Sequence, residues 1–286
     1  MDYQINPLHG LIFGFVILPL TCVLMERLWP SVRNQPVLRE GFSGDVIWYF
    51  VQVFVQRVIA PWVVVLGLIV PFYLVTGLPL ENYWDGFGPL SELHLLWQAL
   101  IVYVAYDFGS YWQHRWFHTG KLWHIHAVHH SSEKLDWLSA TRFHPLNEIA
   151  VQLVCVTPLM CAGISPWAFI IMAPFTGAYA VLLHANLDWD FGPLRRVLAS
   201  PRFHRWHHTS QQQGRNKNFS GGLPIWDILF GTYYMPCGES PQRFGIDEKM
   251  PAGFSAQFLY PFKRWNEVPP KPHSERAAMQ ADETAG

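Results

Sequence analysis

The longest part of this chain without a formal charge runs from Ile149 to Leu187, 39 residues that contain no Asp, Glu, Lys or Arg. Within it, Gly163-Ile164-Ser165-Pro166 is a sequence that favours a tight turn. An α-helix rises about 1.5 Å per residue, so each half covers much of a ~30 Å hydrocarbon core. The run therefore predicts a helical hairpin in a membrane, with one short leg.

Three further runs lack charge, and they cover residues 7–25, 58–80 and 93–106. Pro61 and Pro71 predict kinks or a broken helix in the second of them. Val46 to Gln56 is also uncharged, and it either extends that element or lies along the membrane interface. Charged residues make up 14% of the chain, against about 25% in soluble domains. We expect an all-α integral membrane protein with four or five transmembrane helices. The alternative, a buried soluble core, rarely contains uncharged runs of this length.

Basic residues are distributed unevenly among the connecting segments. Residues 1–10, 77–92 and 161–166 contain no Lys or Arg, whereas Arg27, Arg33 and Arg39 follow the first apolar run. By the positive-inside rule the chain begins outside, and its histidine-rich parts face the cytoplasm. The net charge of −1 argues against a nucleic-acid partner. We expect N-terminal membrane segments over 1–92, a catalytic domain over 93–267, and a disordered, polar tail over 268–286.

Histidine is the chemically informative residue, because 11 of the 14 lie between His114 and His208. HRWFH spaces two of them i, i+4, while HAVHH and HRWHH each follow an i, i+3, i+4 pattern. On an α-helix these spacings place the imidazoles on one face, where they can bind a shared metal or adjacent metals. The candidate ligands in the three clusters are His114, His118, His126, His129, His130, His204, His207 and His208.

Two histidines outside the clusters are also candidates. His184 ends the apolar hairpin in HANLD, where a polar ring is costly unless it binds something. His144, in TRFHP, is a metal ligand, a hydrogen-bond donor to a ligand, or the residue that begins a helix before Pro145. The sequence does not distinguish these three roles of His144.

HRWFH, HAVHHS, TRFHPLNE, HANLD, PRFHRWHH and NF followed by IWDILFGTYY occur here in that order. This series resembles the sterol desaturase / fatty acid hydroxylase superfamily over about Tyr103 to Pro236. The resemblance implies a membrane-bound non-haem di-iron oxygenase that hydroxylates or desaturates a lipid. Some members carry a further histidine four residues before the equivalent of His184, and Ala180 stands there in this chain. His144 is therefore kept as a tenth ligand beside His184 and the eight clustered histidines.

The resemblance further implies two iron ions, on a helical cap at the cytoplasmic end of the transmembrane helices. Imidazole also suits zinc, which can replace iron in a purified sample. Asp107 lies two helical turns before His114 and is expected to act beside the metals, with Asn218 of NKNF as a second candidate. The alternative for Asp107 is a solvated carboxylate at a helix end.

The reaction implies O2, a membrane lipid and an external electron donor of the ferredoxin or cytochrome type. The sequence has no GxGxxG after a strand, no CxxCH and no four-cysteine cluster pattern that would carry electrons within the chain. A histidine-rich metal transporter or metal-binding membrane protein is the competing hypothesis. A transporter needs ligands near the middle of the bilayer, whereas these clusters follow the apolar runs.

Overall fold

The computed structural model describes residues 10, 12–77 and 82–267, which form helices joined by loops. Among these residues the only β pairing is two isolated bridges, Pro30 with Leu187 and Thr209 with Phe244. The predicted all-α class is therefore confirmed for the described chain. The expectation of a disordered tail over 268–286 concerns residues outside those described.

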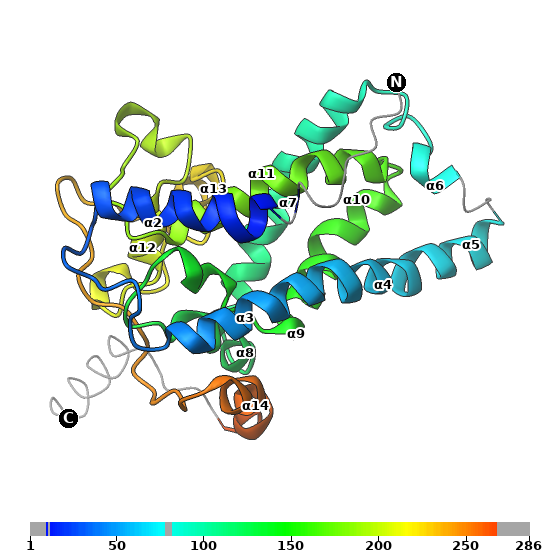
Figure 1. Ribbon diagram of the computed structural model, residues 1–286. Coiled ribbons are helices and arrows are strands. Elements are labelled where there is room, and N and C mark those ends of the chain that lie inside the picture. The colour runs from blue at the N-terminus through cyan, green and yellow to red at the C-terminus, as the bar shows by residue number, and fades with distance from the viewer. Residues whose placement is uncertain (1–9, 11, 78–81, 268–286) are drawn as a thin grey trace, which may run out of the picture.

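The second uncharged run and the segment before it form one long helix (Figure 1). Its consecutive parts are α3 (Phe42–Phe54), η2 (Val55–Ile59), α4 (Ala60–Val64), η3 (Val65–Ile69) and α5 (Val70–Thr76). Of the two alternatives for residues 46–56, the structure selects extension of the helix rather than a separate element along the interface.

Wider turns of π-helix accommodate the prolines in this helix and in others. Each of the four described π-helical segments, which are η1 (Phe13–Ile17), η2, η3 and η5 (Gln152–Val156), ends two residues before a proline. Proline lacks an amide hydrogen, and its ring clashes with the carbonyl four residues earlier. A single widened turn relieves that clash. The helix therefore continues through Pro61, where the sequence allowed a break.

The predicted turn joins two helical legs, and both legs pack against the helix Leu95–Phe117 rather than tightly against each other. The first leg comprises α9 (Pro145–Val151), η5 and α10 (Thr157–Cys161), and the second leg is α11 (Pro166–His184). Gly163 has φ +88°, and a Cβ atom at this position would lie 1.8 Å from the carbonyl oxygen of Phe87. Only glycine fits such a left-handed position at such a close approach. The Ser165 side chain then accepts a hydrogen bond from the Trp167 amide at 3.2 Å and begins α11.

In the described part of the chain, two helices are long and apolar enough to cross a membrane, Phe42–Gly67 and Pro166–His184. Only 17% and 11% of their apolar windows are buried inside the protein, whereas the core helix of a soluble protein is mostly buried. They indicate a membrane protein. The runs at 7–25 and 93–106 contribute to α2 (Leu18–Leu28), preceded by η1, and to α7 (Leu95–Phe117). The total of four or five membrane spans stays a prediction.

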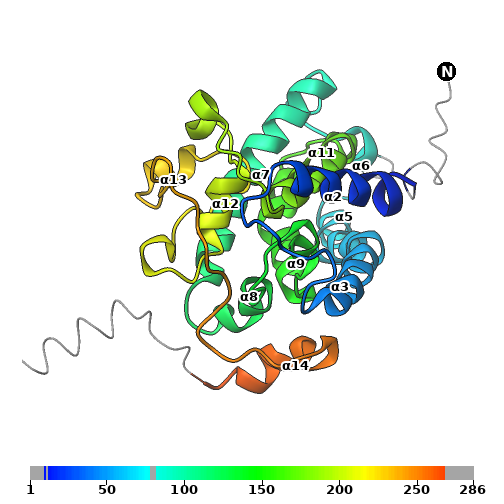
Figure 2. The ribbon, with the colours of Figure 1, turned by 60° about the vertical axis from the view of Figure 1, so that its left-hand side comes forward.

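Short helices gather at the end of the molecule opposite α5 and α6 (Asn82–Asp85) (Figures 1 and 2). They are α8 (Leu122–His130), η4 (Trp137–Thr141), η6 (Gly192–Arg196), α12 (Pro201–His207), η7 (Gln212–Gly214) and α13 (Ile225–Leu229), with α14 (Phe254–Arg264) below α8.

A buried ion network ties the start of α3 to η4. The Arg39 guanidinium contacts Asp45 at 2.7 Å and Asp136 at 2.6 Å, and Arg142 contacts Asp45 at 2.6 Å. Because an unpaired buried charge is costly, these side chains fix how α3 meets the short helices. The loop that leads to His144 is held by the same network.

Candidate metal centre

Four helices bring nine histidines to one place. His114 lies in the last turn of α7 and His118 caps it, while α8 contributes three residues of HAVHH. His184 is the last residue of α11. α12 contributes His204 and His207, and His208 is its C-cap. The helical spacings predicted from HRWFH, HAVHH and HRWHH are therefore confirmed.

The nine rings form two groups. The first consists of His114, His118, His126, His130 and His207, and the second consists of His129, His184, His204 and His208. Within each group the possible ligand nitrogens all lie within 4.8 Å of one another. Because α8 supplies both groups, they are adjacent, and the rings of His130 and His208 stack with centroids 4.3 Å apart.

The nitrogens are spaced as metal ligands would be. In the first group Nε2 of His126 lies 2.9 Å from Nε2 of His114 and 3.1 Å from Nε2 of His130. In the second, Nε2 of His184 lies 3.1 Å from Nε2 of both His129 and His204. Two ligands at right angles, each about 2.1 Å from an ion, lie about 3.0 Å apart.

The outer ring nitrogens of His129 and His184 show which tautomer these two rings adopt. Nδ1 of His129 donates to the Arg142 carbonyl at 3.1 Å, and Nδ1 of His184 donates to the Ala180 carbonyl at 2.7 Å. A carbonyl only accepts, so in the neutral rings both inward Nε2 atoms carry lone pairs. Two such lone pairs 3.1 Å apart repel each other unless a cation lies between them.

Burial keeps the rings neutral. It holds the pKa of His130 well below the usual value, and the neighbouring His208 and His207 lower it further. Nε2 of His118 is buried with no hydrogen-bond partner in the described part of the chain, and it belongs to the first group. A buried acceptor without a partner is costly. This set of neutral imidazoles therefore fits divalent transition metals.

Comparison with known proteins agrees with this geometry. The fatty acid hydroxylase family profile matches residues 99–232. An ornithine lipid hydroxylase of Rhizobium tropici is 31% identical over 264 residues, which cover 91% of this chain and 78% of that protein. The chain belongs to the sterol desaturase / fatty acid hydroxylase superfamily.

Other relatives in this superfamily match shorter parts of their own chains or are less similar. An alkylglycerol monooxygenase of Danio rerio is 34% identical over 152 residues, 52% of this chain and 34% of that protein. A methylsterol monooxygenase of Arabidopsis thaliana is 24% identical over 78% of this chain and 74% of its own. No solved structure matches the chain.

His144 stands apart from both histidine groups. It is the N-cap of α9, where Nδ1 accepts a hydrogen bond from the Leu146 amide at 3.2 Å. Nε2 lies 3.1 Å from the Phe258 carbonyl. Of the roles open at the level of sequence, the structure gives His144 the one that begins a helix. It therefore does not replace the histidine that some superfamily members carry at the position of Ala180.

Asp107 and Asn218 make their described hydrogen bonds to other parts of the chain rather than to histidines. The Asp107 carboxylate accepts from the Leu223 amide at 2.8 Å and from Trp226 Nε1 at 3.0 Å, which fixes the segment before α13 to α7. It is buried, not solvated. The Asn218 side chain donates to the Phe203 and Tyr234 carbonyls at 2.9 Å and 2.6 Å.

The segment around Asn218 nevertheless orients the first histidine group. The Lys217 carbonyl accepts from His207 Nδ1 at 2.7 Å, and the Phe219 carbonyl accepts from His114 Nδ1 at 2.8 Å. Two positions before Asn218, the Asn216 amide oxygen lies 3.1 Å from Nδ1 of His118. Groups that hold the outer nitrogen of a ligand set its orientation. The buried Asn218 lies at the centre of this segment, and its side chain holds the segment to the Phe203 and Tyr234 carbonyls.

Two further side chains, which the sequence did not predict, position the histidines directly or through the backbone. The Asn147 amide oxygen lies 3.0 Å from His126 Nδ1, and the Asp227 carboxylate accepts from the Phe219 and Ser220 amides at 2.8 Å and 2.9 Å. Asn147 lies within the motif TRFHPLNE, so its presence there was a usable signal. The carbonyls that accept from the histidines, such as those of Lys217 and Phe219, belong to the backbone, so no residue type in the sequence marks them.

Proposed function

We propose that this protein catalyses the O2-dependent hydroxylation or desaturation of a membrane lipid at two iron ions. The observation that carries the proposal is the pair of adjacent histidine groups, nine imidazoles from four helices. The hydroxylase and monooxygenase names of the relatives support oxidation of a lipid.

One ion would be held by His114, His118, His126, His130 and His207, and the other by His129, His184, His204 and His208. Five imidazoles around one point exceed the four ligands of tetrahedral zinc, which favours an ion that accepts five or six ligands, such as iron. Bound iron would supply the oxidising power that no side chain can provide. The Lys217 and Phe219 carbonyls would keep the ligands oriented and their inward nitrogens unprotonated.

A lipid substrate is supported by the position of the histidines at the ends of apolar helices. His184 ends the apolar helix α11, and His114 lies in the last turn of α7. A lipid held between these helices would present one carbon to the metals while water is excluded. The basic loops at Arg33 and Arg39 support a cytoplasmic site, where an external ferredoxin or cytochrome would deliver electrons.

The decisive experiment compares the lipids of cells with and without the protein by mass spectrometry, under isotopically labelled O2. We expect one lipid class to gain one oxygen or to lose two hydrogens. A labelled oxygen in the product identifies hydroxylation. The variant His207→Ala should abolish the product, because it removes a ligand of the first group.

The matched control is His94→Asn, a histidine replacement outside both groups. His94 caps α7 through a hydrogen bond from the Leu96 amide, and asparagine preserves such a cap. This variant should retain full activity. An unchanged lipid profile together with metal flux into proteoliposomes would contradict the proposal and support the transporter hypothesis.

A further inference from the structure

The C-terminal helix α14 carries apolar side chains that the rest of the described chain does not cover. Leu259, Phe262 and Trp265 are 45%, 54% and 40% exposed. Leu259 and Phe262 are three residues apart and lie on one stripe of the helix. Gln257 and Tyr260, on the other side of the helix, are buried. Phe254, at the start of the helix, packs edge to face against Trp48, with ring centroids 4.8 Å apart. The residues that the structure describes therefore leave this stripe without a packing partner.

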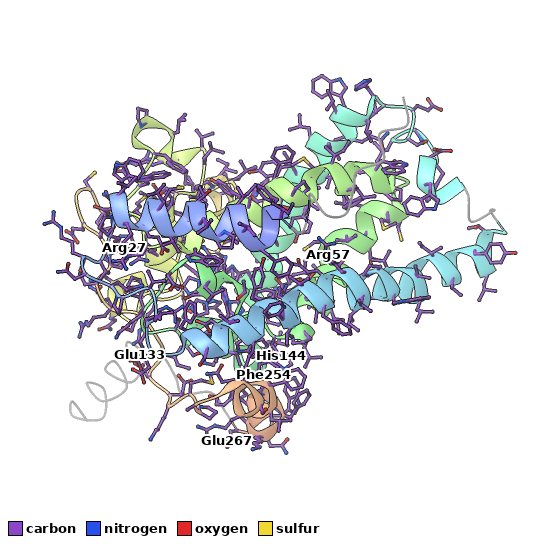
Figure 3. The ribbon with its side chains drawn as sticks, in the orientation of Figure 1. Arg27, Arg57, Glu133, His144, Phe254 and Glu267 are labelled. Carbon is purple, nitrogen blue, oxygen red and sulfur yellow. The ribbon has the colours of Figure 1, made fainter. Side chains whose placement is uncertain are left out.

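The contacts of α14 place it at the level where membrane helices begin. Nε1 of Trp48, in the second turn of α3, donates to Gln257 at 3.0 Å. The ring of His144, which caps α9, lies 5.1 Å from the ring of Phe258 and 5.8 Å from that of Phe262. Figure 3 shows His144 directly above this helix. α3 begins the apolar span Phe42–Gly67, so α14 lies beside the start of a membrane helix.

Its orientation suits a membrane surface. Figure 1 shows α14 almost end-on while α3 to α5 run across the view, so the two axes cross steeply. A helix that crosses a membrane span in this way lies along the interface. Apolar side chains on one stripe and cations on the next are typical of interfacial helices.

The second observation is a hollow of about 320 Å³ on the neighbouring stripe of α14. Lys249, Lys263 and Arg264 line it, together with Tyr260 and Glu267. Arg264 pairs with Glu267, and Glu248 accepts a hydrogen bond from Trp123. Within residues 12–77 and 82–267, no ion pair engages Lys249 or Lys263.

We propose that α14 and the hollow beside it bind anionic phospholipid at the membrane surface. The exposed Phe262 and Leu259 enter the acyl boundary. The two lysines hold the headgroup phosphate. This site is separate from the histidine groups, and it does not depend on the proposed oxidation chemistry.

The test places an environment-sensitive NBD fluorophore on Phe262→Cys in the full-length protein, with the exposed Cys161 and Cys237 changed to Ser. In phosphatidylcholine–phosphatidylglycerol nanodiscs, the emission should shift to shorter wavelength. Doxyl-labelled lipids should quench it and iodide should not. Gln212→Cys, at an exposed position of η7, is the control. Its fluorophore should be quenched by iodide and not by doxyl-labelled lipids. Leu259→Cys repeats the test if the first variant does not fold.

The role of the two lysines in headgroup binding is tested in detergent, by measuring the affinity for a fluorescent short-chain phosphatidylglycerol. Attraction to an anionic surface is worth about 1 kcal/mol per cation, so Lys249→Gln with Lys263→Gln should weaken binding by about 30-fold. Inorganic phosphate at the same concentration should not displace the lipid. Displacement by phosphate would overturn the assignment to lipid.

Two other outcomes would overturn the proposal. Iodide quenching at Cys-substituted Phe262 equal to that at Gln212 would show that the stripe faces water. Protection from iodide only after addition of an acidic electron-carrier protein would assign the surface to that partner instead.

Discussion

Replacement of Asn218 by alanine should loosen one metal site and leave the other intact. Asn218 has φ +58° and is fully buried. Its side chain makes three hydrogen bonds, at 2.9 Å and 2.6 Å as donor and at 2.7 Å as acceptor from the Tyr234 amide. Loss of these bonds, together with the left-handed backbone, costs on the order of 4 kcal/mol of local stability.

The carbonyls on either side of Asn218 hold His207 and His114, so part of this cost should appear as weaker metal binding. Loss of a group that orients a ligand lowers metal affinity about 10–100-fold. Purified variants are titrated with a chelator, and the metal per chain is measured by mass spectrometry. Asn218→Ala should lose one ion at a chelator concentration about 10–100-fold lower than the wild type needs. Asn218→Gly should lose it about fivefold less readily than Asn218→Ala, since glycine recovers about 1 kcal/mol of backbone strain.

Double variants identify which ion is lost. The test uses a chelator concentration that removes one ion from Asn218→Ala but none from the wild type. There, Asn218→Ala combined with His207→Ala should retain one ion, because both changes affect the same histidine group. Asn218→Ala with His184→Ala should retain none. The control Asn34→Ala replaces an exposed asparagine with φ +59° and should retain both ions. Equal loss of both ions from Asn218→Ala alone would show that the segment around Asn218 does not act on the first histidine group alone.

Three further changes test other parts of the structure. His184→Ala should remove one metal ion per chain, whereas His144→Ala should leave the metal content unchanged, as measured by elemental analysis. Gly163→Ala should lower the thermal unfolding temperature of the detergent-solubilised protein, because its Cβ would overlap the Phe87 carbonyl; Gly177→Ala, with open space around it, should not. Asp45→Asn should destabilise the protein by about 3–5 kcal/mol, because it leaves the buried Arg39 and Arg142 short of a charged partner. Its denaturant midpoint should fall, and an unchanged midpoint would show that the network is dispensable.

Much of the site was predictable because helical periodicity fixes which side chains share a face. The i, i+3, i+4 spacing of HAVHH placed three rings on one side of α8, as observed. The same spacing did not show that His129 would belong to a different group from His126 and His130. That division depends on where α11 and α12 approach α8, which is a property of packing between distant segments.

The candidates that lie outside the two histidine groups have physical reasons for their positions. Asp107 lies two turns before His114, yet its carboxylate is used by the Leu223 amide and Trp226. His144 precedes a proline, and its ring completes the first turn of α9. The prolines of the second apolar run predicted kinks or a broken helix, and the helix with its π-helical turns is not broken there. Local sequence therefore indicated the candidate ligands, and tertiary contacts decided which of them lie together.

We propose that nine histidines hold two adjacent metal ions. Anomalous diffraction at the iron absorption edge, from crystals of protein produced with iron, tests it most directly. We predict two peaks, one among the five histidines that include His118 and one among the four that include His184. A single peak, or iron bound elsewhere in catalytically active protein, would contradict the claim.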